Sequence, residues 1–243
     1  MPPRDGKRRI LARLSGLGYV TDSALSKILG VLNEEGVLAS DLGGTSRTSL
    51  SRAPLQQLEA PTIYWPVLQQ LQLPLSAGGF YPWWHVNPFA VLNFLARQEP
   101  KFGHVLYEAS QRNPSTPQNP WHIAWYLDEA CPGNLLSMDL GRKCDLVYWS
   151  FRELGTERLA RESNWMLGGV LKSTVCSKLR SRAATLFRYF LLVMFGQEHN
   201  FLTSGCTVHT ATGVVTICAK LDAVIGDEDA LRAVWGGERC IRT

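Results

Sequence analysis

The sequence lacks cysteines and histidines at the spacing of metal ligands. Six cysteines stand at irregular intervals, and no two of them form a C-x-x-C pair. The five histidines do not pair at the spacing of metal ligands either. A zinc site built from cysteine or histidine is therefore not supported. The cysteines are Cys131, Cys144, Cys176, Cys206, Cys218 and Cys240.

Long apolar runs are missing as well. The strongest one, residues 185–196, is too short and too interrupted to span a bilayer. Residues 1–18 are basic but contain no continuous apolar stretch, which excludes a typical secretory signal peptide. We therefore expect no membrane partner, reduced thiols, and a nuclear or cytoplasmic location.

Charge is sparse and nearly balanced. Charged residues make up 19% of the 243 residues, and the formal net charge is +4. This value permits DNA as a partner without arguing for it, because dedicated nucleic-acid-binding domains are usually more basic and more clustered. The apolar share of 45% and the eight tryptophans are ample material for the core of one large or two small domains.

The first 60 residues are expected to form a small helical region. Residues 21–37 have apolar side chains at helical spacing, with Thr21 or Asp22 as the N-cap and Gly36 at the end. A Ser/Thr/Gly-rich loop follows, and residues 53–60 can form a second short helix. The arrangement is consistent with a DNA-binding helix-turn-helix, but short helical hairpins of other kinds are common.

Residues 61–118 are predicted to be an aromatic and proline-rich connection with one helix. Asn87 is a good N-cap and Pro88 suits the first helical position, so a helix is expected to begin there and to close before Pro100. Residues 111–120 contain three prolines and no other apolar residue, which is typical of a linker. We expect the main domain to follow, over residues 119–243.

The residues after this linker alternate between strand and helix patterns, which predicts a mixed α+β fold. Strands are expected over 121–130, 143–154 and 164–174, and a helix over 177–196. Residues 206–227 are expected to contain a hairpin that turns at Thr212-Gly213, and residues 228–237 a short helix.

Two carboxylates stand where the first and the last long strand end. Strand alternation places Ile123, Trp125 and Leu127 on one face and Asp128 on the other. If the two strands are neighbours, Asp128 and Asp227 can share a divalent cation, and carboxylate oxygens are the ligands that Mg²⁺ and Mn²⁺ prefer. Glu129 and Asp222 are competing candidates for the same role.

Each of these acids also has an ordinary structural interpretation. Aspartate is common where a strand turns, and Asp227 can cap the helix expected over 228–237. Basic residues near these elements can contact phosphate groups or can simply be solvated. These candidate phosphate contacts are Arg142, Lys143, Arg180 and Arg182.

Several stretches carry a resemblance to a known family: TIYWPVLQQLQLP, GGFYPWWHVNPFAVL, PQNPWHIAWYLDEACPGNLL, RKCDLVYWSFRELG and IGDEDALRAVWGG. They are similar to a multi-copy family of reading frames in dinoflagellate genomes. That family resembles the catalytic region of cut-and-paste transposases of the Plavaka and Kyakuja-Dileera-Zisupton type, which have a ribonuclease H-like fold. The resemblance covers roughly residues 60–240, and the expected order of three strands, helix, strand and helix is also the plan of ribonuclease H-like nucleases.

The resemblance implies a partial ribonuclease H-like sheet with flanking helices and a metal site. Asp128 and Asp227 match the first two metal-binding acids, so Mg²⁺ or Mn²⁺ is the expected cofactor of an active form. The family continues into a Cys-x-x-Cys pair and a third acid. Here only Cys240 matches that pair, and the third acid is missing.

The sequence thus predicts a transposase-derived domain of a mobile element, whose ancestral activity is metal-dependent cleavage and transfer of DNA strands. We expect it to be incomplete and inactive, whereas an active form would be a divalent-metal-dependent nuclease or transposase. Two alternatives stay open: a nucleic-acid-binding module without catalysis, and a decayed reading frame with no molecular function. The sequence indicates no small-molecule ligand and no oligomeric state.

Overall fold

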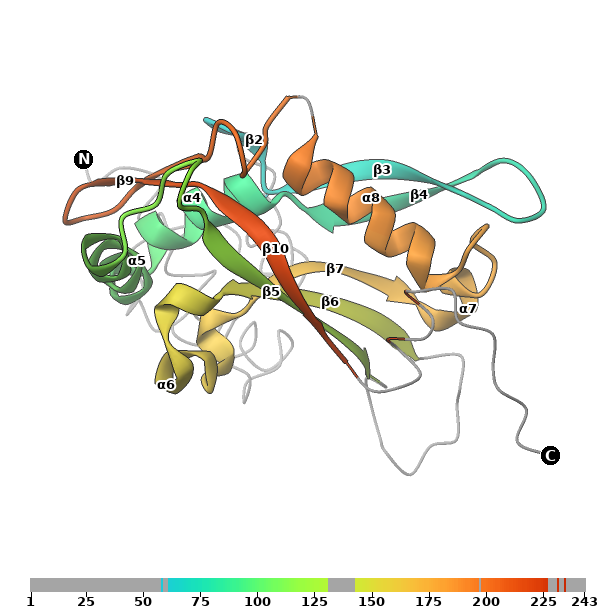
Figure 1. The fold of residues 1–243 in the computed structure, drawn as a ribbon. Helices are drawn as coiled ribbons and strands as arrows, with labels where there is room; N and C mark the ends of the chain where they lie inside the picture. Colours follow the sequence, from blue (N-terminus) through green and yellow to red (C-terminus); the bar gives the residue numbers. More distant parts are fainter. Residues whose placement is uncertain are drawn as a thin grey trace, which may run out of the picture. The chain divides into compact units, whose positions relative to one another are not determined.

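A six-stranded mixed sheet is the centre of the fold (Figure 1). The strand order is β10-β5-β6-β7-β4-β3, and all neighbours are antiparallel except β10, which runs parallel to β5. The strands are β3 (Leu68–Pro74), β4 (Phe80–Val86), β5 (Trp121–Ala130), β6 (Cys144–Phe151), β7 (Met166–Lys172) and β10 (Ala219–Ile225). The predicted mixed α+β class is confirmed.

The computed structural model describes residues 58, 61–130, 143–196, 198–226, 231 and 234. The chain divides into two compact units, residues 1–60 and 61–243. The helices and the helix-turn-helix expected in the first 60 residues lie outside the described residues. So does most of the short helix expected over 228–237.

Helices and small hairpins surround the sheet. The helices are α4 (Pro88–Gln98), α5 (Pro100–Arg112), α6 (Thr156–Leu159), α7 (Ser173–Cys176) and α8 (Ala183–Phe195). Two 3-10 turns, η2 (Arg152–Leu154) and η3 (Glu162–Asn164), flank α6. The small strands are β1 (Pro61–Thr62), β2 (Trp65–Pro66), β8 (Cys206–His209) and β9 (Val214–Ile217). Within the described ranges, no helix has both the length and the apolar character that crossing a bilayer needs.

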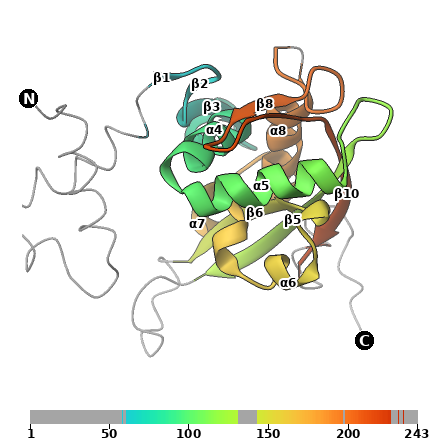
Figure 2. The same cartoon turned by 90° about the vertical axis from the view of Figure 1, so that its left-hand side faces the viewer.

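The two faces of the sheet are covered differently. Helix α8 lies on one face and α6 on the other (Figure 1). On the α8 face, the ring of Trp125 lies 4.8 Å from the rings of both Phe187 and Phe190. The hairpin β8–β9 lies beside α4 and α5 (Figure 2). The four tryptophans that are almost fully buried, Trp83, Trp121, Trp125 and Trp149, form much of the core.

Several local predictions agree with the structure. Helix α4 begins at Pro88, and the Asn87 side chain accepts hydrogen bonds from the N–H groups of Phe89 and Ala90. Strands β5, β6 and β7 lie within the three ranges expected for them, and β8 and β9 form the predicted hairpin. Ile123, Trp125 and Leu127 are buried, and Asp128 on the opposite face is exposed, as the alternation predicts.

The segment 61–86 differs from the irregular connection that we expected. It contains the hairpin β3–β4, and His85 of β4 pairs with Gly169 of β7. Residues 61–118 therefore belong to the same compact unit as residues 119–243. Val67 and Asn87 form a hydrogen-bonded pair, and hydrogen-bonded pairs alternate with non-bonded pairs along β3 and β4. Pro82 pairs with Gln72 at a non-bonded position, so β4 loses no hydrogen bond to β3 through the missing N–H of Pro82.

Two other boundaries differ from the expectation. Pro100 closes α4 but also begins α5, since proline suits the first turn of a helix. The run 214–225 is split into β9 and β10 at Cys218, whose backbone N–H and C=O both bond to the Ser115 hydroxyl. Ser115 thus binds the N–H and C=O of Cys218, which would otherwise be free to extend the pairing of the hairpin.

Candidate functional site

The parallel pair β5–β10 positions the candidate acids. Its register runs from Ala219 opposite Trp121 to Ile225 opposite Tyr126, with an irregularity between Leu221 and Ala223. The two strands therefore end at the same edge of the sheet. Ile225 and Tyr126 each stand two residues before a candidate acid, Asp227 and Asp128 respectively. Asp227 itself lies outside the described residues.

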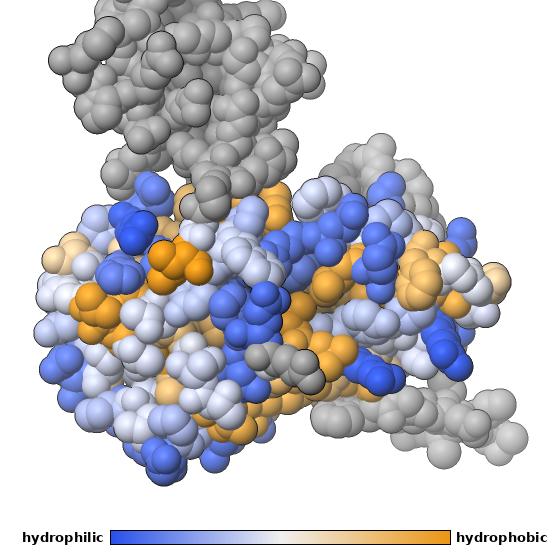
Figure 3. Space-filling view, turned by 90° about the horizontal axis from the view of Figure 1, so that it is seen from above, coloured by the Kyte–Doolittle hydropathy of each residue, from blue (hydrophilic) through white to orange (hydrophobic). Residues whose placement is uncertain are grey.

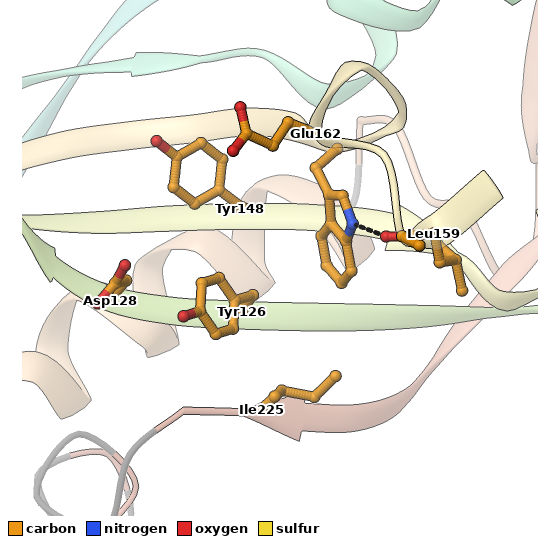
Figure 4. A pocket seen from close by; sticks show the side chains of 8 residues that line it. Tyr126, Asp128, Tyr148, Leu159, Glu162 and Ile225 are labelled. Carbon is orange, nitrogen blue, oxygen red and sulfur yellow. Dashed lines mark hydrogen bonds between the residues drawn. The ribbon is translucent and has the colours of Figure 1, made fainter. Parts of the chain in front are cut away.

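Asp128 lies at a pocket of about 620 Å³ on the sheet face opposite α8. Figure 4 shows Asp128 and Tyr126 on β5 and Tyr148 on β6, with Ile225 of β10 beside them. Asp128 is exposed and makes no ion pair with another described residue. Its carboxylate is therefore accessible to a ligand or a cation.

The other side of this pocket comes from α6 and the residues after it. The indole N–H of Trp165 donates to the carbonyl of Leu159 at 2.8 Å, which holds the ring in place. The rings of Trp165 and Tyr126 meet edge to face, with centroids 6.2 Å apart. Glu162 is a second carboxylate in the lining, near Tyr148 in Figure 4. The pocket thus combines aromatic walls with two acids.

Glu129 lies on the other face of β5, as the alternation predicts. Its carboxylate is 3.1 Å from the ammonium of Lys143, and it lies opposite Asp145 on β6. Burial raises the pKa of Asp145, and Glu129 adds to that effect. The buried Oδ2 of Asp145 has no hydrogen-bond partner in the described residues. This face therefore carries a second, separate group of acids.

Asp145 was not among the residues that we singled out from the sequence. A signal for it exists, because Asp145 is an acid directly before the apolar run of a predicted strand. Alternation alone places it on the face of Val147 and Trp149, both fully buried. Burial of an acid at such a position is a common cause of a raised pKa.

Asp222, the other competing candidate, forms an ion pair with the guanidinium of Arg152. The hydrogen bond from Arg152 lowers the pKa of Asp222. Asp222 does not line the pocket of Asp128. The ion pair with Arg152 gives Asp222 a structural role that does not require a metal ion.

The candidate phosphate contacts do not gather around Asp128. Arg142 lies outside the described residues, and Lys143 is engaged with Glu129. Arg180 lies beside the far end of β3, where its backbone N–H donates to the carbonyl of Pro74. Arg182 precedes α8 with a left-handed backbone, at φ 48°. Neither Arg180 nor Arg182 lines the pocket.

The predicted helix over 177–196 begins only at Ala183. The N–H of Ser181, which lies before α8, donates to the hydroxyl of Thr185 in the first turn of α8, at 3.0 Å. The basic residues 178–182 therefore lie in turns ahead of α8, where we had expected them on a helix. Residues 178–182 therefore do not form the basic face of a helix.

Within the described ranges, no three His, Cys, Asp or Glu side chains come together closely enough to hold a metal ion. Comparison of the chain with protein-family models, with curated proteins and with solved structures finds no match. The geometry around Asp128 is therefore the basis for any functional assignment.

Proposed function

We propose that residues 119–243 derive from a ribonuclease H-like transposase domain, with metal-dependent cleavage and transfer of DNA strands as the ancestral activity. The observation that carries the proposal is the strand order β7-β6-β5-β10, with β10 parallel to β5. In chain order, β10 is the fourth strand of this group and β5 is the first, and the two are neighbours. This is the condition for Asp128 and Asp227 to share a cation.

The donors around Asp128 suit a hard cation. Carboxylates line the pocket, whereas no cysteine or histidine is among its lining residues. Oxygen donors favour Mg²⁺ or Mn²⁺ over zinc. Asp128 and Asp227 are the residues that would hold the ion. A bound ion of this kind polarises a phosphate group and lowers the pKa of a coordinated water.

The contribution of the chain itself is to hold Asp128 on a rigid strand. Asp128 is flanked by the buried Leu127 and pairs with Leu146 of β6, while the pairing of β5 with β10 extends as far as Tyr126. A carboxylate on a paired strand keeps its orientation, because no flexible loop has to become ordered when a ligand binds.

DNA is the proposed partner, and the pocket beside Asp128 supports this choice. Tyr126, Tyr148 and Trp165 offer aromatic surface to a base displaced from a strand. A nuclear or cytoplasmic location is part of the same proposal, and Cys176, Cys206 and Cys218 form no disulfides in the structure.

Titration of the full chain with Mn²⁺, followed by calorimetry, tests the metal site. We expect Asp128→Asn and Asp227→Asn each to weaken binding about tenfold or more, equivalent to about 1.4 kcal/mol. Glu129→Gln is the matched control, since it removes the adjacent carboxylate on the opposite face. It is expected to leave the Mn²⁺ affinity unchanged.

Absence of Mn²⁺ binding by the unaltered chain would overturn the metal site. Equal losses in Asp128→Asn and Glu129→Gln would show that the binding is not specific to the face of β5 that carries Asp128. A single-stranded oligonucleotide tests the partner separately. Affinity for DNA that falls steeply with salt but does not depend on Mn²⁺ or Asp128 would favour a binding module without catalysis.

A further inference from the structure

The two edges of the sheet differ in how well they are protected against pairing with another strand. β10, at one edge, carries the exposed Lys220, the ion-paired Asp222 and a register irregularity beside Asp222. Charges and bulges are devices by which proteins protect an edge strand. β3, at the other edge, has the sequence LQQLQLP and carries no charged residue.

Backbone groups of β3 point away from the sheet. The N–H of Asn87 donates to the carbonyl of Val67, so Val67 and every second residue after it bond to β4. The backbone groups of Leu68, Gln70 and Gln72 therefore point outward. Among the described strands, β3 pairs with β4 alone. Beyond Pro74 the edge is covered, because Arg180 bonds to Pro74 and Leu75 bridges to Leu179.

A groove of about 780 Å³ runs along this edge. Its lining includes four consecutive residues of β3, Leu68–Leu71, so it follows the strand and not one face of it. Trp65, Trp84 and Leu192 also line it, and about half of each side chain is exposed, at 48%, 57% and 56%. Figure 3 views the molecule from the side of α8 and β3, and apolar surface is exposed there between hydrophilic patches.

Trp65 adds a second observation at the same groove. Its φ of 72° lies in the left-handed region, which is uncommon for a bulky side chain. Strained backbone of this kind persists where the surroundings hold it and is frequent at binding sites. At Trp65 it accompanies an indole that lies against His199 while remaining half exposed.

We propose that this edge is an interface between two copies of the chain, in which β3 of each copy pairs antiparallel with β3 of the other. Pairing of like strands about a twofold axis needs one surface that is complementary to itself. In the register centred on Gln70, Gln70 pairs with Gln70 of the second copy, and Leu68 pairs with Gln72. All the outward backbone groups of Leu68, Gln70 and Gln72 then find partners.

Charge favours a second copy as the occupant. The paired strands bring no like charges together, because β3 carries none. The neutral glutamines at the centre can form hydrogen bonds with each other across the axis. The exposed indoles and Leu192 lie in the groove beside the new strand, so pairing removes apolar surface from water.

Sedimentation equilibrium of the full chain from about 1 to 100 µM tests this interface. We expect the unaltered chain to approach twice its 27.1 kDa mass. Gln70→Pro removes an outward N–H that β4 does not use, and is expected to weaken the dimer about tenfold. Gln70→Lys and Gln70→Glu place like charges opposite each other, and each is expected to weaken it about fivefold.

An equimolar mixture of Gln70→Lys and Gln70→Glu chains is expected to restore association, since opposite charges then meet at the axis. Val214→Lys is the control, because Val214 is exposed on β9, away from the groove. A monomer at every concentration would overturn the proposal. So would a dimer that Gln70→Pro and Gln70→Lys leave intact, or a mixture of charge variants that does not associate.

Discussion

At the scale of single residues, the core holds polar side chains that have no partner. His85 is 1% exposed, and its ring nitrogens make no hydrogen bond of normal geometry with a described residue, although the backbone of Gln69 acts against the lowering of its pKa. Burial lowers the pKa of His85 to about 4. The imidazole is therefore neutral at pH 7, packed beside Trp83 with ring centroids 5.6 Å apart.

His85 makes stability depend on pH. The unfolded chain takes up a proton near pH 6.5, whereas the folded chain does so only near pH 4, so acid favours the unfolded state between these values. We expect a loss of about 2 kcal/mol in the free energy of unfolding between pH 7.5 and pH 5 from this group alone. Urea unfolding of His85→Phe is expected to show a smaller loss over that range. The control His104→Ala, at an exposed histidine, is expected to keep it; equal slopes in both variants would contradict the assignment.

At the scale of elements, α4 connects the first part of the unit to the rest. Its N-cap, Asn87, is 3% exposed and also donates from its amide to the carbonyl of Tyr64 at 2.9 Å. The side chain therefore fixes both the helix start and the preceding turn. Glu99, the residue before α5, makes no side-chain hydrogen bond as a cap.

These two caps offer a matched comparison. Asn87→Ala is expected to lower the free energy of unfolding by about 2 kcal/mol, because it leaves buried N–H groups and the Tyr64 carbonyl without partners. Glu99→Ala is expected to change it by less than about 0.5 kcal/mol. Thermal unfolding measured for both variants checks the difference. Similar losses in the two would mean that Asn87 does not act through its side-chain bonds.

Local patterns along the chain predicted some elements well and others poorly. The Asn87-Pro88 start of α4 and the outward position of Asp128 depend on neighbours in sequence, and both agree with the structure. The hairpin β3–β4 was not predicted because its prolines and glycines interrupt the alternation of apolar and polar residues. Pro82 lies at a position of β4 where an N–H would not bond to β3. The split at Cys218 was missed because Ser115, which causes it, is distant in sequence. Of the two candidate acids, the structure places Asp128 at a pocket, and Asp227 lies outside the described residues.

At the scale of the whole molecule, residues 61–243 form one compact unit. One sheet spans it, from β3 at one edge to β10 at the other, and all eight tryptophans of the chain belong to it. Trp121 of β5 contacts Phe151 of β6, and Trp125 of β5 contacts Phe187 of α8. Such a core is expected to be lost in one step.

A chain that begins at Pro61 is therefore expected to unfold in a single cooperative transition. Circular dichroism and tryptophan fluorescence, followed in urea, should have coincident midpoints. This result would argue against a decayed reading frame, which predicts no sharp transition. Two separate midpoints would show instead that residues 61–243 are not one folding unit.

The parallel pair β5–β10 has a consequence for the growing chain on the ribosome. β5 can pair with β6 soon after both are made, but its other edge stays open until β10 is synthesised. At the usual rate of roughly 5–20 residues per second, that interval lasts several seconds. During this interval the nascent protein exposes the unpaired edge of β5. A chaperone or a strand from another chain can bind this edge before β10 pairs with it.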